Sequence, residues 1–426
     1  MKKYWKLVRG LNGDMQLCVW ANGLSGFTVD GGIYAVILNL YLLRLGYGAQ
    51  FIGAVNGTGL LAYGLFSLAA GWLGSRFGTR SMITLGLAMM AAGGFALPLA
   101  EFAAPSFGVI WIIASFVVTN MGLALQATNC TPFLAESSQM EERHTFFSIV
   151  ATVWSLAGFA GNVVGGLLPP LFGFLLSASL GEAAPYRYSL WLSPVLLLAA
   201  AVVMVMRRAA RFKPISVSPV QLASQSSGAG PIAMLALVRF LFVLGCGAVL
   251  IFLNMYLDKD LGAGAAGIGL LLGAGRLCAG VMSLLAPRLA ARWSKANLIL
   301  ATAVGTSLSM IPLILLAQTN AAAFSFIGVM TLLAIRLPTW LAYSMEAVGP
   351  ARRGLMSGAG EMANGLGFAA VGLGGGYVIH AVGYRPLFLL CACLTAAGAW
   401  LFDRYCRPRP QSERVPGTPI PLTPES

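Results

Sequence analysis

Long apolar stretches, separated by short charged or Pro/Gly-rich points, recur about twelve times along this chain and constrain its fold more than any other feature. A helix needs roughly 20 apolar residues to cross the hydrocarbon core of a bilayer, which is about 30 Å thick. The stretches have this length. They predict membrane-spanning helices at residues 17–43, 50–74, 81–103, 107–133, 145–173, 188–206, 231–257, 265–290, 297–318, 322–346, 354–381 and 385–403.

The composition agrees with a chain whose main solvent is lipid. Hydrophobic residues make up 58% of the 426 residues and charged residues only 10%, which is unlike a water-soluble domain of this length. Residues 1–13 are mostly polar and basic, and the first apolar stretch is long enough to span. We therefore expect no cleaved signal peptide.

The net charge of +13 is explained by where the 27 Lys and Arg residues fall. Twenty of them lie at the N-terminus, in the even-numbered loops or in the C-terminal tail, and four lie in the odd-numbered loops: Arg44, Arg187, Lys259 and Arg385. Because cytoplasmic loops carry the excess of Lys and Arg, this pattern predicts a multi-pass protein of the bacterial inner membrane with both termini in the cytoplasm. Lipid contact accounts for the basic charge, so a nucleic-acid partner is not expected.

The sequence contains an internal repeat with an offset of 215 residues in its first block and 216 after a one-residue length difference. Leu38–Leu42 (LNLYL) recurs as Leu253–Leu257 (LNMYL), and the glycines at 57 and 59 recur at 273 and 275. Glu136 and Arg143 have the same spacing as Glu346 and Arg353. The chain is therefore predicted to consist of two similar halves.

A ten-residue segment after the second stretch resembles the loop signature of the major facilitator superfamily, G-x-L-a-D-r-x-G-r-k. The match is at Gly71, Leu73, Arg76, Gly78 and Arg80, and Ser75 stands where the family has Asp. In the family this loop latches the two halves on the cytoplasmic side, a role in which Glu136 could take part. The alternative is that Arg76 and Arg80 only set orientation.

The resemblance implies an all-α membrane protein with twelve transmembrane helices in two pseudo-symmetric six-helix halves. Its expected parts are an N-terminal half at 1–206, a cytoplasmic linker at 207–230, a C-terminal half at 231–403 and a disordered tail at 404–426. The segment Gly161–Gly166 (GNVVGG) resembles the antiporter signature G-P-x-x-G-G, with Asn162 where the family has Pro. A monomer is expected.

Five charged residues lie deep inside the apolar stretches: Asp30, Arg239, Arg276, Arg336 and Glu361. In the fold that the chain resembles, their helices surround the central cavity. A charge at mid-membrane costs at least about 2.5–3.5 kcal/mol, so each of these residues is a candidate for substrate binding or a member of a pair. Three bases against two acids leave one Arg uncompensated, which favours a substrate with a carboxylate or phosphate group. Alternatively, Arg336 pairs with Glu361 and Arg276 with Asp30 as structural bridges.

Further candidates for the substrate site are uncharged. Trp340 follows Arg336 by four residues, on the same helix face, and could stack on a ring of the solute. Asn129 offers donors and an acceptor at a similar depth, although such residues more often bond neighbouring helices. The carboxyl groups of Asp30 and Glu361 are candidates for proton coupling, because a desolvated carboxyl group can bind a proton near neutral pH.

Other functional classes have little support in the sequence. An enzyme would need clustered acids, His or a nucleophile, and the chain has only His144 and His380. The seven Cys residues lie mostly inside apolar stretches, so we expect no metal and no cofactor. We therefore predict a secondary transporter for a small organic solute, an exporter of amphipathic or anionic compounds. The alternatives are an uptake permease for an organic anion and a non-transporting sensor.

Overall fold

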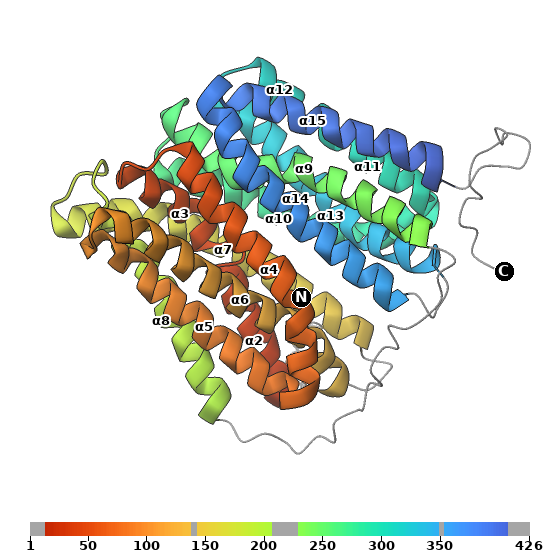
Figure 1. Cartoon of the computed structure of the whole chain (residues 1–426), viewed down its shortest axis with the longest axis horizontal. Coiled ribbons are helices and arrows are strands. Elements are labelled where there is room, and N and C mark those ends of the chain that lie inside the picture. Colours follow the sequence, from red (N-terminus) through yellow and green to blue (C-terminus); the bar gives the residue numbers. More distant parts are fainter. Residues whose placement is uncertain (1–12, 138–142, 207–228, 349–352, 408–426) are drawn as a thin grey trace, which may run out of the picture. The chain divides into compact units, whose positions relative to one another are not determined.

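The computed structural model of the chain describes residues 13–137, 143–206, 229–348 and 353–407 (Figure 1). Regular structure in these ranges is helical throughout. Eleven of the helices are long and apolar enough to cross a membrane. Most of the predicted linker at 207–230 and most of the predicted tail lie outside the described residues; the last two linker positions belong to the start of a helix, and Phe402–Cys406 continues the last helix as a short π-helical turn.

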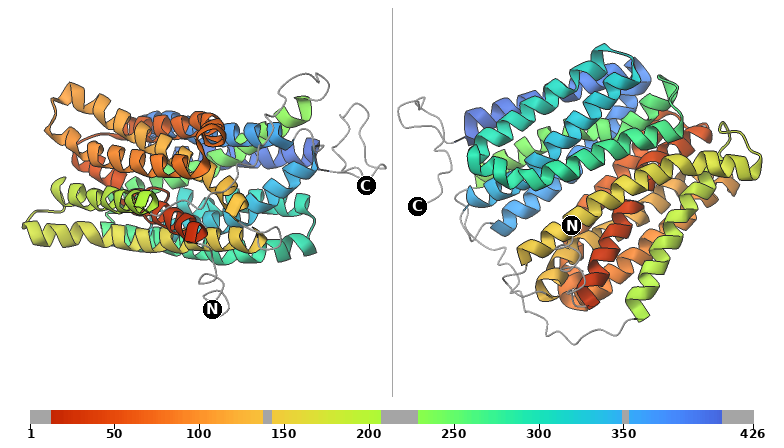
Figure 2. Two further views of the ribbon diagram at one scale, coloured as in Figure 1. Left: turned by 90° about the horizontal axis from the view of Figure 1, so that it is seen from below. Right: turned by 180° about the vertical axis from the view of Figure 1, so that it is seen from behind.

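The chain divides into two compact units. The first holds residues up to Tyr47, Thr58–Ser218 and Gly264–Gly273. Within it, α5 packs against α6 and α8, and α2 packs against α7, as the view from behind also shows (Figure 2). Its elements are α2 (Gly13–Phe27), α3 (Ile33–Arg44), most of α4 (Ala49–Phe77), α5 (Thr79–Leu99), η1 (Ala100–Phe102), α6 (Pro105–Ser137), α7 (Arg143–Leu176), α8 (Ala184–Met206) and the first turns of α10.

The second unit holds Gly48–Gly57, Pro219–Ala263 and the chain from Ala274 onward. Within it, α9 packs against α14 and α15, and α11 packs against α13 (Figure 1). Its elements are the first turns of α4, α9 (Ala229–Lys259), most of α10 (Ala265–Arg292), α11 (Lys295–Ser309), α12 (Ile311–Leu315), α13 (Thr319–Glu346), α14 (Arg353–Val382), α15 (Tyr384–Leu401) and η3 (Phe402–Cys406).

Eleven of the twelve predicted spans correspond to helices that are long and apolar enough to cross a membrane, and the span predicted at 17–43 corresponds to two shorter helices. Two of the twelve contain a break. The span predicted at 17–43 consists of α2 and α3, with an interruption at Thr28–Gly32 where Gly31 adopts φ +89°. Only glycine enters this region without steric cost, so the Gly31-Gly32 pair allows the chain to leave and re-enter the helix. The span predicted at 297–318 changes from α11 to α12 at Met310, just before Pro312, whose ring cannot continue a helix.

The internal repeat has a structural counterpart. Leu38–Leu42 lies near the C-terminal end of α3 and Leu253–Leu257 near the C-terminal end of α9, and all ten residues are buried. Large apolar side chains on α7 and α8 are exposed instead, including Phe174, Val205 and Met206. Exposed apolar surface of this extent is expected where lipid replaces water as the solvent.

Candidate functional site

Asp30 lies in the interruption of the first span, between the end of α2 at Phe27 and the start of α3 at Ile33. Its Oδ2 accepts a hydrogen bond of 2.9 Å from the indole Nε1–H of Trp154 on α7. The carboxyl group is half-buried. Irregular backbone at membrane depth is tolerated only where protein or a water-filled cavity surrounds it, and broken helices are typical of ion and substrate sites in transporters. The interruption is therefore a candidate coupling site within the first unit.

Glycines allow α7 to approach this interruption closely. A Cβ atom on Gly161 would lie 2.1 Å from the carbonyl oxygen of Phe27, and one on Gly165 would lie 3.1 Å from the Cα of Ile33. A Cβ atom on Gly26 would lie 2.7 Å from the Trp154 ring. Two glycines of the GNVVGG segment thus pack against the break in the first span. The antiporter-like signature indicated glycine packing without indicating its partner.

Arg239 and Arg336, the basic pair, lie inside the second unit. Arg239 on α9 is 7% exposed, and its Nη2 donates a hydrogen bond of 3.2 Å to Oδ1 of Asn364 on α14. Glu361, one turn earlier on α14, is exposed and lies close enough to attract the Arg239 guanidinium group. The two guanidinium groups of the basic pair repel each other. Positive charge is therefore concentrated in a buried part of the second unit.

Arg336 on α13 is the more extreme member of the basic pair, with 1% exposure. Its Nη1 donates to Oγ1 of Thr306 at 3.3 Å, and its guanidinium group lies 4.9 Å from the centre of the Phe242 ring. The Nε and Nη2 atoms of Arg336 are buried and have no hydrogen-bond partner among the described residues. The sequence left a bridge between Arg336 and Glu361 open as an alternative, but the described residues include no ion pair between them.

Trp340 contacts the same ring as Arg336. It packs edge-to-face on Phe242 at 5.7 Å between ring centres and lies 6.0 Å from Phe402. Trp340 is 4% exposed and belongs to a core cluster with Tyr343 and Met356. In this conformation its ring is covered by protein.

The remaining candidates of the predicted substrate site have different surroundings. Asn129 on α6 is 1% exposed, and its Nδ2 donates to the carbonyl oxygens of Ala70 on α4 and Leu125 on its own helix. Both donors of this amide therefore serve helix packing. Arg276 on α10 is half-buried and is engaged in interactions of its own.

The loop signature lies at the junction of α4 and α5. Gly78 has φ +90° and starts α5, which explains the glycine at this position. Arg76 packs on Trp72 and Phe77 of its own helix, and Arg80 donates to the carbonyl oxygen of Met204 near the end of α8, at 2.8 Å. The side chain of Glu136 lies outside the described part of the chain. In the second unit, Glu346 pairs with Lys295.

An ion pair near the ends of the outer helices was not predicted from the sequence. Glu101 in η1 pairs with Arg187 on α8 at 3.1 Å, and Tyr41 donates to the same carboxylate at 3.4 Å. The Arg187 guanidinium group lies over the rings of Phe102 and Tyr188, at 5.1 and 4.9 Å from their centres. The pair joins α3, η1 and α8 of the first unit, so we assign it a structural role.

Arg187→Ala is therefore expected to destabilise the first unit. It leaves the carboxylate of Glu101 half-buried without a cation and removes the ring contacts, a loss of about 1–3 kcal/mol. Thermal unfolding of the detergent-purified protein should show a lower midpoint than that of the wild type. Arg385→Ala is the matched control, since Arg385 is an exposed arginine in the second unit. Equal midpoints for the two variants would contradict the structural role of the pair.

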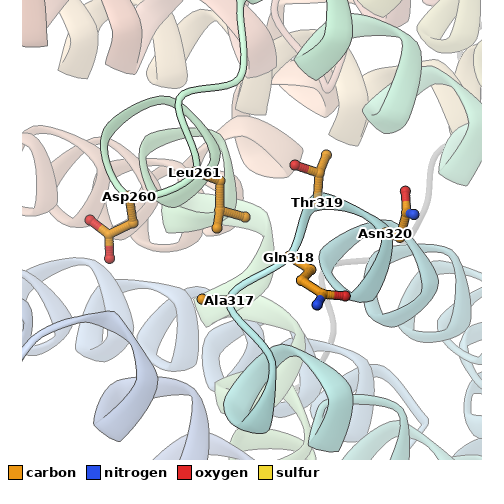
Figure 3. Close-up of a pocket in the computed structure, with 6 residues that line it drawn as sticks. All are labelled: Asp260, Leu261, Ala317, Gln318, Thr319 and Asn320. Atoms are coloured by element: carbon orange, nitrogen blue, oxygen red, sulfur yellow. The ribbon is translucent and has the colours of Figure 1, made fainter.

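An open pocket of about 420 Å³ lies in the second unit, between the turn after α9 and the start of α13 (Figure 3). Asp260, Leu261 and residues 317–320 line it, but the Asp260 carboxylate points away from Gln318 and Thr319 (Figure 3). Burial raises the pKa of the Asp260 carboxyl group, and the charges of Arg385 and Lys259 oppose this shift. The described residues contain no group of three His, Cys, Asp or Glu side chains that could hold a metal ion.

The chain is similar in sequence to a known family and to individual proteins of that family. The family model of the Major Facilitator Superfamily matches residues 19–231 and 235–424. Among curated proteins, the chain is 31% identical over 144 residues to "Probable anion transporter 3, chloroplastic" of Arabidopsis thaliana, and 26% identical over 158 residues to an uncharacterized MFS-type transporter of Mycobacterium tuberculosis. These matches cover 34% and 37% of this chain, and in both cases 26% of the relative.

Solved structures are similar over almost the whole chain. An inward-open structure of the xylose transporter XylE from E. coli has a TM-score of 0.72 at 14% identity, and it covers 94% of this chain and 97% of that one. The nucleoside transporter NupG has a TM-score of 0.70 at 15% identity, and it covers 92% and 99% of the two chains. At such identities the similarity concerns the fold alone.

Proposed function

Because the chain belongs to the major facilitator superfamily and is a membrane transporter, not an enzyme, we propose that it exports a small anionic, amphipathic organic solute, driven by protons. The observation that carries this proposal is the basic pair. Arg336 and Arg239 are buried in the second unit, and two of the nitrogens of Arg336 have no partner among the described residues.

The energetic argument starts from the cost of a buried cation. A buried guanidinium group that has no counter-charge and leaves some of its N–H groups without acceptors, as Arg336 does, is unfavourable by several kcal/mol. Transporters of this family alternate between conformations, and a solute enters when the binding site opens. A carboxylate or phosphate that reached the basic pair would supply both missing partners, because a guanidinium group binds such groups through parallel hydrogen bonds. The binding energy of the solute would thus be largest at this position.

The relative from Arabidopsis thaliana supports the choice of an anion, since its name assigns it to anion transport. The match spans about a quarter of that protein. We therefore propose only the class of substrate, an anion, for this chain, and not a particular compound. We place the solute in the second unit, at Arg239 and Arg336 beside Glu361, with Arg276 and Trp340 as further candidates in the same unit.

Proton coupling is assigned to the carboxyl groups of Asp30 and Glu361. Asp30 lies at a helix break with an indole N–H as hydrogen-bond donor, and Glu361 lies beside Arg239. A solute anion at Arg239 would compete with Glu361 for the same cation, so substrate binding would change the proton affinity of Glu361. By linkage, protonation of Glu361 would free Arg239 for the anion, so the two binding events at this position strengthen each other. The exclusion of one by the other that export by exchange requires is therefore assigned to Asp30.

The orientation follows from the distribution of basic residues. We propose that the protein is a monomer in the inner membrane, with both termini in the cytoplasm and with the loop signature between α4 and α5 on the cytoplasmic side. Export and uptake are distinguished by the orientation of the vesicles in which the solute accumulates. In inside-out vesicles energised with a proton gradient, an exporter accumulates solute, whereas a permease for uptake does so only in right-side-out vesicles, and a sensor does so in neither.

The substrate class is tested by counterflow in proteoliposomes. Preloaded carboxylates and organic phosphates should exchange with labelled external solute, whereas cationic and neutral compounds should not. Arg239→Gln, which keeps a hydrogen-bond donor beside Asn364 but removes the charge, should raise the half-saturation concentration about 10- to 100-fold, the value of one charge-assisted hydrogen bond. Arg385→Gln, an exposed arginine, is the matched control. Counterflow of lipophilic cations that Arg239→Gln leaves unchanged would overturn the proposal.

A further inference from the structure

Two cysteines that lie 112 residues apart meet inside the first unit. The Sγ atoms of Cys18 on α2 and Cys130 on α6 are 2.8 Å apart, and both side chains belong to one core cluster, with 0% and 5% exposure. A bonded disulfide has an S–S length of about 2.05 Å, so the sulfurs need to approach each other by only about 0.8 Å more. In the reduced protein the contact is a thiol–thiol hydrogen bond.

We propose that Cys18 and Cys130 are a modification site, at which a hydroperoxide of small size and no charge converts the two thiols into a disulfide. In the first step one sulfur attacks a peroxide oxygen, the O–O bond breaks, and the products are a sulfenic acid and water. In the second step the other sulfur attacks the sulfenic sulfur, the S–O bond breaks, and a second water leaves with the thiol proton. Two thiols and one hydrogen peroxide thus give one disulfide and two waters.

The geometry favours the second step over competing reactions. Burial makes the first step slow, because a buried thiol stays protonated and the thiolate is the nucleophile. Once one sulfur is oxidised, the other is already in contact with it, so closure is effectively intramolecular and faster than further oxidation by peroxide. The site is therefore expected to trap the disulfide rather than a sulfinic acid.

The disulfide has a mechanical consequence, which rests on the proposed transport function. α2 is separated from α3 by the interruption at Thr28–Gly32, so the two helices are not one continuous rod, and we infer that α2 moves relative to α3 during transport. A bond from Cys18 to Cys130 fixes α2 to the continuous helix α6. Oxidation would remove the freedom that the interruption provides, and we expect it to slow transport several-fold and reversibly.

The chemical part is tested on the wild-type protein in membranes. After hydrogen peroxide treatment, denaturation and alkylation, peptide mass spectrometry should find five of the seven cysteines alkylated and a peptide pair joined through Cys18 and Cys130. Reduction with a dithiol should restore alkylation at all seven. Cys246 is the internal control, since it is buried in the second unit at 2% exposure. If both thiols alkylate as completely after peroxide as before it, the modification site is ruled out.

The transport part uses proteoliposomes and the variants Cys18→Ser and Cys130→Ser. Peroxide should slow the wild type several-fold, a dithiol should restore its rate, and neither variant should respond. An unchanged rate in protein that carries the crosslink would overturn the mechanical consequence. Failure of the reduced protein to move any anion would instead contradict the proposed transport function, and it would leave the alkylation result unaffected.

Discussion

Replacing Arg336 with methionine is expected to leave the protein folded and to abolish transport of the anionic solute. Arg336 is 1% exposed, and its Nε and Nη2 atoms are unpartnered among the described residues. A methionine of similar length fills the space beside Phe242 without a charge to desolvate. Replacing buried charges by apolar residues of similar volume is often neutral or stabilising by about 1–4 kcal/mol. The thermal unfolding midpoint should therefore be equal to or above that of the wild type.

The loss of transport has a separate cause. If the solute carboxylate or phosphate binds the basic pair, Arg336→Met removes a bidentate partner in a low-dielectric site and leaves Arg239 alone. Solute binding measured by thermal shift should disappear, since a ligand stabilises only the state that binds it. Arg288→Met, at an exposed arginine of α10, should retain both binding and transport. A stable Arg336→Met protein that transports at the wild-type rate would falsify the role assigned to Arg336.

The fold could be predicted from the sequence, but much of the candidate site around Arg336 could not. The twelve spans follow from apolar length, and the two halves follow from the repeat at Leu38–Leu42 and Leu253–Leu257, both of which depend on local composition. Membrane depth also identified Asp30, Arg239 and Arg336, because charges are costly there. Depth does not determine the helix face, however. Trp340 is at the predicted spacing from Arg336, yet its ring is packed between Phe242 and Phe402.

Contacts between distant segments account for what the sequence could not reveal. The interruption at Thr28–Gly32 was not predicted from the sequence, and its contact with Trp154 and Gly161 joins residues more than 120 positions apart. The pairing of Glu101 with Arg187 and the meeting of Cys18 with Cys130 are of the same kind. Periodicity and spacing describe one helix at a time, whereas these sites depend on how several helices pack.

Asp30→Asn is expected to uncouple transport from the proton gradient while leaving solute exchange intact. The asparagine side chain keeps nearly the same shape, and its carbonyl oxygen can still accept the hydrogen bond from the Trp154 indole N–H, so the interruption between α2 and α3 should persist. It cannot take up or release a proton, however. In proteoliposomes, accumulation driven by a proton gradient should fall to the level without a gradient, whereas counterflow of preloaded solute should continue.

Trp154→Phe removes the hydrogen bond that the Trp154 indole donates to the Asp30 carboxylate. The phenyl ring keeps the packing against Gly26 but cannot donate to Asp30, so the carboxylate loses a hydrogen bond that favours its charged form. The pH dependence of gradient-driven transport should therefore differ from that of the wild type, whereas counterflow of preloaded solute should be unchanged. Glu182→Gln, at an exposed carboxylate, is the control for both variants and should behave like the wild type. Full gradient-driven accumulation by Asp30→Asn would exclude Asp30 as the proton carrier. Glu361, the carboxylate beside Arg239, would then be the remaining candidate.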